Sequence, residues 1–253
     1  MASSLQSTIR DLHRRRGRER RGLALAEGVR LVEEILAANI EISGAVLAPA
    51  VENTPRGQAL AATLVTSGIP VERVDDRSMA ALADTEHPQG VIVVFRPRAW
   101  RFADFGPAPV LVLDAVQDPG NVGTMLRTAD ALGAGGVVAL PGTADLTNPK
   151  VVRGGMGASF RLPVLHASGG DLAGWLAESG RILWIAEADG ELVGQGGRPG
   201  ALALVVGNEG AGVQSDIAEL AARRIGIRLR TGAESLNVAV AAGILLYEVM
   251  RGR

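Results

Sequence analysis

The stretch Ala201-Leu-Ala-Leu-Val-Val206, followed at once by Gly207-Asn-Glu-Gly-Ala-Gly212, decides the fold of the C-terminal part of this 253-residue chain. A continuous apolar run that leads into a glycine-rich loop is typical of a buried strand in a parallel sheet. The pattern returns where Ile225-Gly-Ile-Arg-Leu-Arg230 leads into Thr231-Gly-Ala-Glu-Ser-Leu-Asn237 and an apolar helix. Loops at the carboxyl edge of such a sheet expose backbone N–H and C=O groups to ligands. We therefore expect the functional site at these two turns.

The sequence before these turns alternates strand and helix signals. Further apolar strands are predicted at Val110–Asp114, Val137–Leu140, Leu162–Leu165 and Ile182–Ala186. The helices predicted between them are Asn121–Leu132, Asn148–Ala158 and Asp171–Glu178. Strands of near-continuous Val, Leu and Ile between helices indicate an α/β domain, over residues 110–253, whose parallel sheet is covered on both faces.

A smaller α/β domain is predicted over residues 1–96. Its expected helices are Leu5–Arg16, Val29–Ala38, Gly57–Val65 and Asp76–Ala83, and its expected strands are Leu23–Ala26, Ala45–Leu47, Ile69–Val74 and Val91–Phe95. Residues 97–109 contain three prolines and no sustained periodicity, so we interpret them as the linker between the domains.

Composition excludes several kinds of site. The chain has no cysteine, which rules out disulfides, thiolate catalysis and zinc held by cysteine. His13, His87 and His166 lie far apart without metal-binding spacing, so we expect no metal. The N-terminus lacks the apolar core of a signal peptide, and Leu236–Met250 is too short to span a membrane. We expect a cytoplasmic protein.

Arginines crowd one N-terminal segment although the formal net charge of the chain is only −1. They are Arg10, Arg14, Arg15, Arg16, Arg18, Arg20 and Arg21. Lys150 is the only lysine in the chain, so part of this abundance reflects a general use of arginine in place of lysine. We favour RNA phosphate contact over a solvated helix face. The residues to which we assign that contact are Arg14, Arg15, Arg16 and Arg18.

A second polar group follows the strand Val110–Asp114. Asn121 lies near the start of the next predicted helix, and Arg127 lies six residues further on, within two turns. An arginine in this place can hold a phosphate or carboxylate with the fixed donors of its guanidinium. The alternative is a surface arginine that pairs with Asp130 or another acid. The glycines of Gly207–Gly212 do not match the dinucleotide-binding fingerprint, which argues against a nucleotide-dependent dehydrogenase.

Three motifs carry a family resemblance when they are taken together. They are Asn121-Val-Gly-Thr-Met-Leu-Arg127-Thr-Ala, Val206-Gly-Asn-Glu209-Gly-Ala-Gly212 and Glu234-Ser235-Leu-Asn237-Val-Ala-Val. In order and spacing they resemble the signature motifs of the SpoU/TrmH family. Members of this family are S-adenosylmethionine-dependent RNA 2′-O-ribose methyltransferases of the SPOUT superfamily. The likeness covers Val110–Arg251. Upstream, Leu12-His-Arg-Arg-Arg, Glu27-Gly-Val-Arg-Leu and His87-Pro-Gln-Gly-Val resemble the substrate-binding domain that many members carry, a fold like that of ribosomal protein L30e.

This resemblance implies a particular fold. The C-terminal Rossmann-like parallel sheet would carry a deep trefoil knot, in which the segment from about Leu204 threads through a loop of the same chain. Such a knot is a rare exception to unknotted topology. The N-terminal domain would be L30e-like. Because catalytic domains of the family dimerise beside the site, we also expect a homodimer.

The resemblance also assigns site residues. Those expected to contact the methyl donor are Gly207, Ile227, Leu236, Leu140, Pro141 and Gly142. Those expected to be catalytic are Arg127, Asn121, Glu209, Ser235 and Asn237. Asn121 would orient Arg127 or the ribose, and Glu209 would hold its loop. Ser235 and Asn237 would bind ribose or donor, although helix capping is a simpler role that both can have.

Arg127 is often given the role of general base in this family, but an arginine has a pKa above about 12 and essentially never deprotonates. We therefore expect Arg127 to contact the target phosphate of the RNA and to stabilise the forming 2′-alkoxide. The proton would leave through that phosphate or water. In one departure, many relatives have Ile-Pro-Met where this chain has Ile227-Arg-Leu, followed by Arg230. The change either loosens the loop or adds phosphate contacts.

The resemblance thus implies an RNA ribose 2′-O-methyltransferase that uses S-adenosylmethionine without a metal. The expected substrate is 23S rRNA, because tRNA-acting relatives more often carry only short helical extensions in place of an L30e-like domain. A tRNA 2′-O-methyltransferase and an antibiotic-resistance rRNA methylase stay open as alternatives. The alternative hypothesis outside the enzymes is a non-catalytic RNA-binding factor for ribosome assembly that retains the knot.

Overall fold

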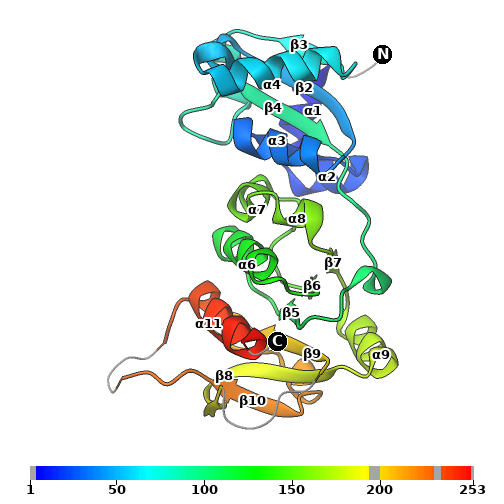
Figure 1. Ribbon diagram of the computed structural model, residues 1–253, viewed down its shortest axis with the longest axis vertical. Helices are drawn as coiled ribbons and strands as arrows, with labels where there is room; N and C mark the ends of the chain where they lie inside the picture. The colour runs from blue at the N-terminus through cyan, green and yellow to red at the C-terminus, as the bar shows by residue number, and fades with distance from the viewer. Residues whose placement is uncertain (1–3, 194–199, 231–234, 252–253) are drawn as a thin grey trace. The chain divides into compact units, whose positions relative to one another are not determined.

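The computed structural model describes residues 4–193, 200–230 and 235–251 (Figure 1). The chain divides into two compact units. The N-terminal unit comprises Met1–Arg98 with Thr147–Phe160, and the C-terminal unit comprises Ala99–Leu146 with Arg161–Arg253. None of the helices in the described ranges has the length and apolar character needed to cross a membrane.

The N-terminal unit is built on a mixed sheet with the strand order β1-β4-β2-β3. These strands are β1 (Ala24–Glu27), β2 (Ile42–Leu47), β3 (Val71–Arg73) and β4 (Val91–Phe95). β4 runs antiparallel to both β1 and β2, whereas β2 and β3 are parallel. Every residue of β4 is buried, as its central position and continuous apolar sequence predict.

Helices cover both faces of this sheet. They are α1 (Leu5–Leu12), α2 (Arg15–Arg21), α3 (Val29–Ala37), α4 (Pro55–Thr66) and α5 (Asp76–Leu82), with a 3-10 turn η1 (Pro49–Asn53). Val91, Val93 and Phe95 of β4 belong to the core formed with α3 and α4. Ile92 and Val94 alternate with them and belong to the core formed with α1 and α5.

The N-terminal helix is shorter than the sequence predicts. In place of one helix over Leu5–Arg16, α1 ends at Leu12 and Arg14 is extended, with φ −92° and ψ 137°. The cause is Arg18, whose Nη1 donates to the carbonyl oxygens of Leu12 at 2.9 Å and His13 at 3.0 Å. Gly17 permits the tight return, since a Cβ there would lie 2.0 Å from the carbonyl oxygen of Asp11.

The segment Thr147–Phe160 packs with the N-terminal residues, although it lies between elements of the C-terminal unit in sequence. It forms α7 (Pro149–Gly155) and leads into α8 (Ala158–Arg161). The expected single helix is divided because Met156 adopts a left-handed conformation, with φ 49°. Phe160 belongs to the core beside α3 and α4. Its ring packs edge-on against the ring of Phe95, with the two ring centroids 5.4 Å apart.

The C-terminal unit contains a parallel sheet of order β10-β8-β9-β5-β6-β7. Its strands are β5 (Val110–Leu113), β6 (Gly136–Ala139), β7 (Val164–His166), β8 (Ile182–Leu192), β9 (Leu202–Val206) and β10 (Arg223–Gly226). The central strands β5 and β9 are buried along their whole length. A parallel-stranded α/β fold was expected here and is confirmed.

Helices cover both faces of this sheet as well. They are α6 (Pro119–Leu132), α9 (Gly169–Ser179), α10 (Ser215–Ala218) and α11 (Val238–Met250), with a 3-10 turn η2 (Phe102–Asp104). Val110 and Val112 of β5 pack in one core with Leu172 and Trp175 of α9. Alternate residues of β5 point to the other face, where α11 packs beside α6 (Figure 1).

The edge of the sheet departs from the expected register. β8 extends to Leu192, whereas β10 stops at Gly226 instead of Arg230. Arg224 pairs with Ile185, but the next residue of β10 pairs with Glu191. The intervening residues 186–190 are therefore displaced from the ladder, and residues 186–188 border a cavity.

Candidate functional site

The turn after β5 places Asn121 in the first turn of α6. Asp118 is the N-cap, and its Oδ1 accepts the backbone N–H of Asn121 at 2.7 Å. Pro119 at the first helical position has the fixed φ that a helix start requires. Asn121 therefore lies just beyond the carboxyl end of β5.

The side chain of Asn121 connects the other two motifs. Its Nδ2 donates to Oε1 of Glu209 at 2.9 Å, and its Oδ1 accepts from Nδ2 of Asn237 at 3.0 Å. Asn237 is also the N-cap of α11, with its Oδ1 accepting the backbone N–H of Ala239 at 2.9 Å. Capping and contact with the other motifs thus coexist in Asn237, because the two uses employ different atoms of its amide.

The loop after β9 is held in a tight form by Asn208. Its Nδ2 donates to the carbonyl oxygen of Ala115 at 3.0 Å, and its Oδ1 accepts backbone N–H groups of Gly210 and Ala211. Gly207 lies directly against the return of the loop, since a Cβ there would be 2.3 Å from the carbonyl carbon of Gly212. The glycines of this motif therefore serve close backbone packing.

Asp114 is a site residue that the sequence analysis did not single out. Its side chain is buried, and its oxygens accept the backbone N–H of Gln214 at 2.7 Å and the Nε2–H of the same residue. These bonds join the end of β5 to the end of the glycine loop. The available signal was an acid at the end of an otherwise apolar strand.

A cavity of about 200 Å³ opens beside these motifs. Its lining comes from segments 186–188, 206–212, 225–229 and 235–245. Five of the expected site residues line it: Gly207, Glu209, Ile227, Ser235 and Leu236. The displaced residues of β8, Ala186 to Ala188, also line it and were missed, because nothing in their sequence distinguishes them from a strand end. Glu234 of the third motif lies outside the described residues.

Six residues expected to be catalytic or to contact the donor do not line this cavity. Asn121 and Asn237 reach it only through their bonded group, in which Asn121 contacts Glu209 of the lining. Leu140 packs into the core beneath α9, and Gly142 lies against Ala115. Pro141 lies between them and is exposed. Arg127 is exposed on α6, about 120° around the helix axis from Asn121. The alternative that Arg127 pairs with Asp130 is wrong, because Asp130 pairs with Arg161 at 2.9 Å.

Arg127 makes no hydrogen bond or ion pair with any residue that the structure describes. Its guanidinium is therefore available to an external anion. In the described part of the chain, no three His, Cys, Asp or Glu side chains are grouped closely enough to hold a metal ion.

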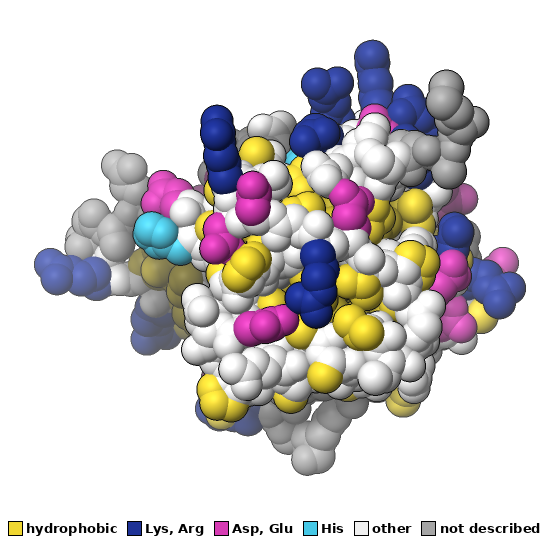
Figure 2. All heavy atoms as spheres, turned by 90° about the horizontal axis from the view of Figure 1, so that it is seen from above, with side chains coloured by type: hydrophobic (Ala, Val, Ile, Leu, Met, Phe, Trp, Pro, Cys, Tyr) yellow, Lys and Arg dark blue, Asp and Glu magenta, His cyan; other side chains and the backbone are white. Residues whose placement is uncertain are grey.

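The N-terminal arginines divide into two kinds. Arg14, Arg15 and Arg16 are exposed, with Arg15 paired to Glu19 at 2.7 Å. Arg18 is only 4% exposed and its donors are occupied inside the unit, so it does not have the surface position that RNA contact requires. On the face drawn in Figure 2, Lys and Arg side chains are interspersed with Asp and Glu and do not form one continuous patch.

The C-terminal unit has a parallel sheet with a cavity at its carboxyl edge, and beside the cavity side chains from three distant motifs bond to one another. This arrangement is typical of an enzyme that holds an organic ligand between loops. Residues 108–247 match the SpoU rRNA Methylase family, and residues 7–93 match the MRM3-like substrate binding domain. The chain belongs to the SpoU rRNA methylase family and is an RNA ribose 2′-O-methyltransferase. The resemblance seen in the three motifs is thereby confirmed.

Similar proteins include RNA-modifying enzymes along nearly the whole chain. The 23S rRNA (guanosine(2553)-2′-O)-methyltransferase RlmP of Bacillus subtilis is 37% identical over 239 residues, covering 94% of this chain and 92% of that protein. The 23S rRNA (guanosine-2′-O-)-methyltransferase RlmB of Pseudomonas syringae is 32% identical, covering 79% and 84%. The solved AdoMet-bound rRNA methyltransferase from Sinorhizobium meliloti is 30% identical with a TM-score of 0.86, covering 99% and 97%.

Proposed function

We propose that this enzyme transfers a methyl group from S-adenosylmethionine to a ribose 2′-oxygen of 23S rRNA. The observation that carries the proposal is the bonded group of Asn121, Glu209 and Asn237, of which Glu209 lines the cavity. The rRNA substrate is favoured over tRNA because RlmP, named as a 23S rRNA enzyme, matches 94% of the chain. The site residues do not distinguish an antibiotic-resistance methylase from an enzyme of ordinary rRNA modification.

The residues at the cavity suit the methyl donor. Ile227, Leu229 and Leu236 offer apolar surface for an adenine, and the backbone of Gly207 and Gly226 offers polar groups at its edge. When bound, S-adenosylmethionine supplies an electrophilic methyl group on its sulfonium. Ser235 and Glu209 border the same cavity, where they would contact the ribose or the amino-acid part of the donor.

Arg127 would act as a cation and not as a base. It has no described partner, and it lies on α6, the helix that also carries Asn121. A guanidinium can hold the phosphate next to the target ribose and stabilise negative charge on the 2′-oxygen. Asn121 would orient the ribose, and the bonds from Glu209 and Asn237 would keep its amide in place. Alignment of donor and acceptor supplies much of the rate enhancement.

The expected knot, domains and homodimer are part of the proposal. Threading of the tail is supported by the gathering of loops after β8, β9 and β10 with the start of α11 around one cavity. A substrate-binding domain at 1–96, L30e-like, a linker at 97–109 and a catalytic domain at 110–253 agree with the matches at 7–93 and 108–247. Val240, Ile244 and Tyr247 leave an exposed apolar stripe on α11, which suits a homodimer.

The test is transfer of labelled methyl groups to a 23S rRNA transcript by the wild type and by Arg127→Ala. We expect transfer by the wild type, ribose methylation at one nucleotide by mass spectrometry, and a large loss in the variant. If neither protein transfers methyl groups to rRNA or tRNA while both bind RNA, the chain is a binding factor. Transfer to tRNA alone would replace the rRNA assignment.

A further inference from the structure

A second cavity, of about 250 Å³, lies within the N-terminal unit. Its lining includes Glu27, Arg30, Leu31, His87, Gln89, Arg153 and Met156. They come from the segment that joins the end of β1 to the start of α3, the loop before β4, and α7 with the residue after it. Two of these segments belong to Glu27-Gly-Val-Arg-Leu and His87-Pro-Gln-Gly, motifs to which the catalytic proposal gives no role.

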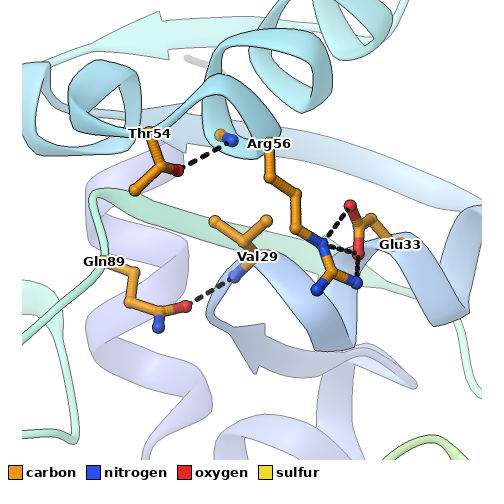
Figure 3. Close-up of polar contacts among 6 residues, drawn as sticks. Val29, Glu33, Thr54, Arg56 and Gln89 are labelled. Carbon is orange, nitrogen blue, oxygen red and sulfur yellow. Dashed lines mark hydrogen bonds and ion pairs between the residues drawn. The ribbon is translucent and has the colours of Figure 1, made fainter.

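Gln89 joins the two motifs. Its Oε1 accepts the backbone N–H of Val29 at 2.9 Å, as Figure 3 shows. Gly28 makes room for this contact, because it has φ +99° and a Cβ there would lie 3.1 Å from the same oxygen. The bond fixes the orientation of the amide. The Nε2 group of Gln89 keeps both of its donors unused among the described residues.

The acids beside this cavity are occupied by internal partners. The carboxylate of Glu27 accepts the backbone N–H of Asp84 at 2.8 Å and the hydroxyl of Thr85. Asp84 in turn pairs with Arg153 at 2.9 Å. These contacts hold the loop before β4 and position the Arg153 guanidinium at the cavity. The charge of Asp84 is thus compensated by Arg153, whereas Glu27, which also lines the cavity, keeps its charge and has its oxygens engaged by neutral donors.

Two further polar side chains at the cavity have no partner in the described chain. Arg30 and His87 are both exposed, and neither forms a hydrogen bond or ion pair with a described residue. Arg30, His87 and the Nε2 of Gln89 therefore present donors around one opening. Leu31 and Met156 supply apolar surface in the same lining.

This combination fits a nucleotide better than an isolated phosphate. Apolar walls suit the faces of a base, while arginine and amide donors suit its edge and its phosphate. RNA-binding proteins hold unpaired nucleotides by stacking on aromatic rings or guanidinium planes together with hydrogen bonds to base edges. The planar groups of this kind in the lining are His87, Arg30 and Arg153. On the face drawn in Figure 2, charges of both signs alternate, so this face offers RNA no broad basic patch.

We propose that the cavity bordered by Arg30, His87, Gln89 and Met156 binds one unpaired nucleotide of the RNA substrate. The base lies against Leu31 and Met156, and Arg30 and Arg153 face its phosphate. The pocket holds the RNA at a nucleotide other than the one that is methylated. This inference rests on the proposed function only in taking RNA as the ligand.

The test uses the full-length enzyme, a 23S rRNA transcript, and the variants Arg30→Ala, His87→Ala and their combination. Loss of the Arg30 guanidinium from the phosphate and of the His87 donor from the opening should raise Kd for the transcript and KM by about tenfold in the double variant. We expect kcat and the affinity for S-adenosylmethionine to be unchanged. Arg77→Ala is the matched control, since Arg77 is exposed in the same unit on α5 and does not line the cavity.

A second measurement does not depend on the variants. A transcript containing 4-thiouridine should crosslink on irradiation to a peptide that includes His87 or Met156. A Kd for the double variant equal to that of Arg77→Ala, or crosslinks confined to other peptides, would overturn the proposal. Free AMP, GMP, CMP or UMP that binds as tightly as the transcript would overturn the assignment to RNA. Failure of the proposed function is distinct, because the wild type would then bind and crosslink RNA without methylating it.

Discussion

The side-chain amide of Asn237 donates to the amide oxygen of Asn121 at 3.0 Å, across 116 residues of sequence. Because that oxygen is thus an acceptor, the Nδ2 of Asn121 faces Glu209, with which it bonds at 2.9 Å. The start of α11, the start of α6 and the glycine loop after β9 are therefore one bonded unit. Changing any member should disturb the other two.

Asn121→Asp should lower the rate of methyl transfer by roughly tenfold or more, since it removes the donor to Glu209 and places two carboxylates together. Repulsion raises the pKa of such a pair, so the variant should regain part of its activity as the pH is lowered. The measurement is kcat over a range of pH. Asn53→Asp, at an exposed position of η1, should behave as the wild type. A variant with wild-type kcat at every pH would remove Asn121 from the catalytic group.

Gly207→Ala should weaken the binding of S-adenosylmethionine. The added Cβ would lie 2.3 Å from backbone atoms of Gly212. A backbone cannot move aside as the end of a flexible side chain can, so the clash would persist. Overpacking of this kind costs about 1–3 kcal/mol, so we expect S-adenosylmethionine to bind at least about tenfold more weakly by calorimetry. Gly210→Ala is the control in the same loop, since its Cβ would meet only Oδ1 of Asn208 at 3.6 Å. Equal affinities in the two variants would show that the loop adapts.

Asp114→Asn should destabilise the C-terminal unit. The buried carboxylate accepts two bonds from Gln214, and an amide in its place would direct an N–H group at one of these donors. Loss of a buried charge-assisted bond costs about 1–3 kcal/mol in the free energy of unfolding, measured by urea denaturation. Asp189→Asn is the comparison, because Asp189 is exposed. Equal stabilities would mean that Asp114 does not hold the loop.

The exposed stripe on α11 should mediate self-association. Val240 is 51% exposed and Tyr247 52% exposed, and together with Ile244 they recur at helical spacing. We expect the wild type to have the mass of a dimer by light scattering and the double variant Val240→Glu, Tyr247→Arg that of a monomer. Val65→Glu, at a residue 50% exposed on α4, should leave the mass unchanged. A monomeric wild type would contradict the proposed homodimer.

The sequence predicted what local patterns encode. Apolar runs located β4 to the residue and β9 to within one residue. The glycine at position 133 correctly predicted that α6 ends at Leu132. The register break in β10 escaped prediction, because it depends on pairing between Arg224 and Ile185 in distant segments. The pattern of strands placed the second and third motifs at one edge of the sheet, but the participation of Asn121 was inferred from resemblance, since nothing local to Asn121 indicates a bond to Asn237.

The arginine cluster near the N-terminus shows the same limit and gives the last prediction. Spacing alone treated Arg16 and Arg18 as equivalent, but only Arg16 is exposed. Arg18 donates to Leu12 and His13, and its Nε donates to Oγ1 of Thr147 at 3.2 Å. It therefore ties α1, α2 and the segment before α7 together inside the N-terminal unit.

Arg18→Ala should reduce the free energy of unfolding by about 2 kcal/mol or more, because it leaves buried carbonyl groups without donors. Arg16→Ala should leave thermal stability unchanged and weaken RNA binding. If Arg16 contacts one phosphate, the slope of log K against log salt should become shallower by about 0.7–0.9. Filter binding at several salt concentrations measures that slope, and differential scanning calorimetry measures stability. A salt slope equal to the wild type in Arg16→Ala would assign this residue to a solvated helix face, which is the alternative that the sequence left open.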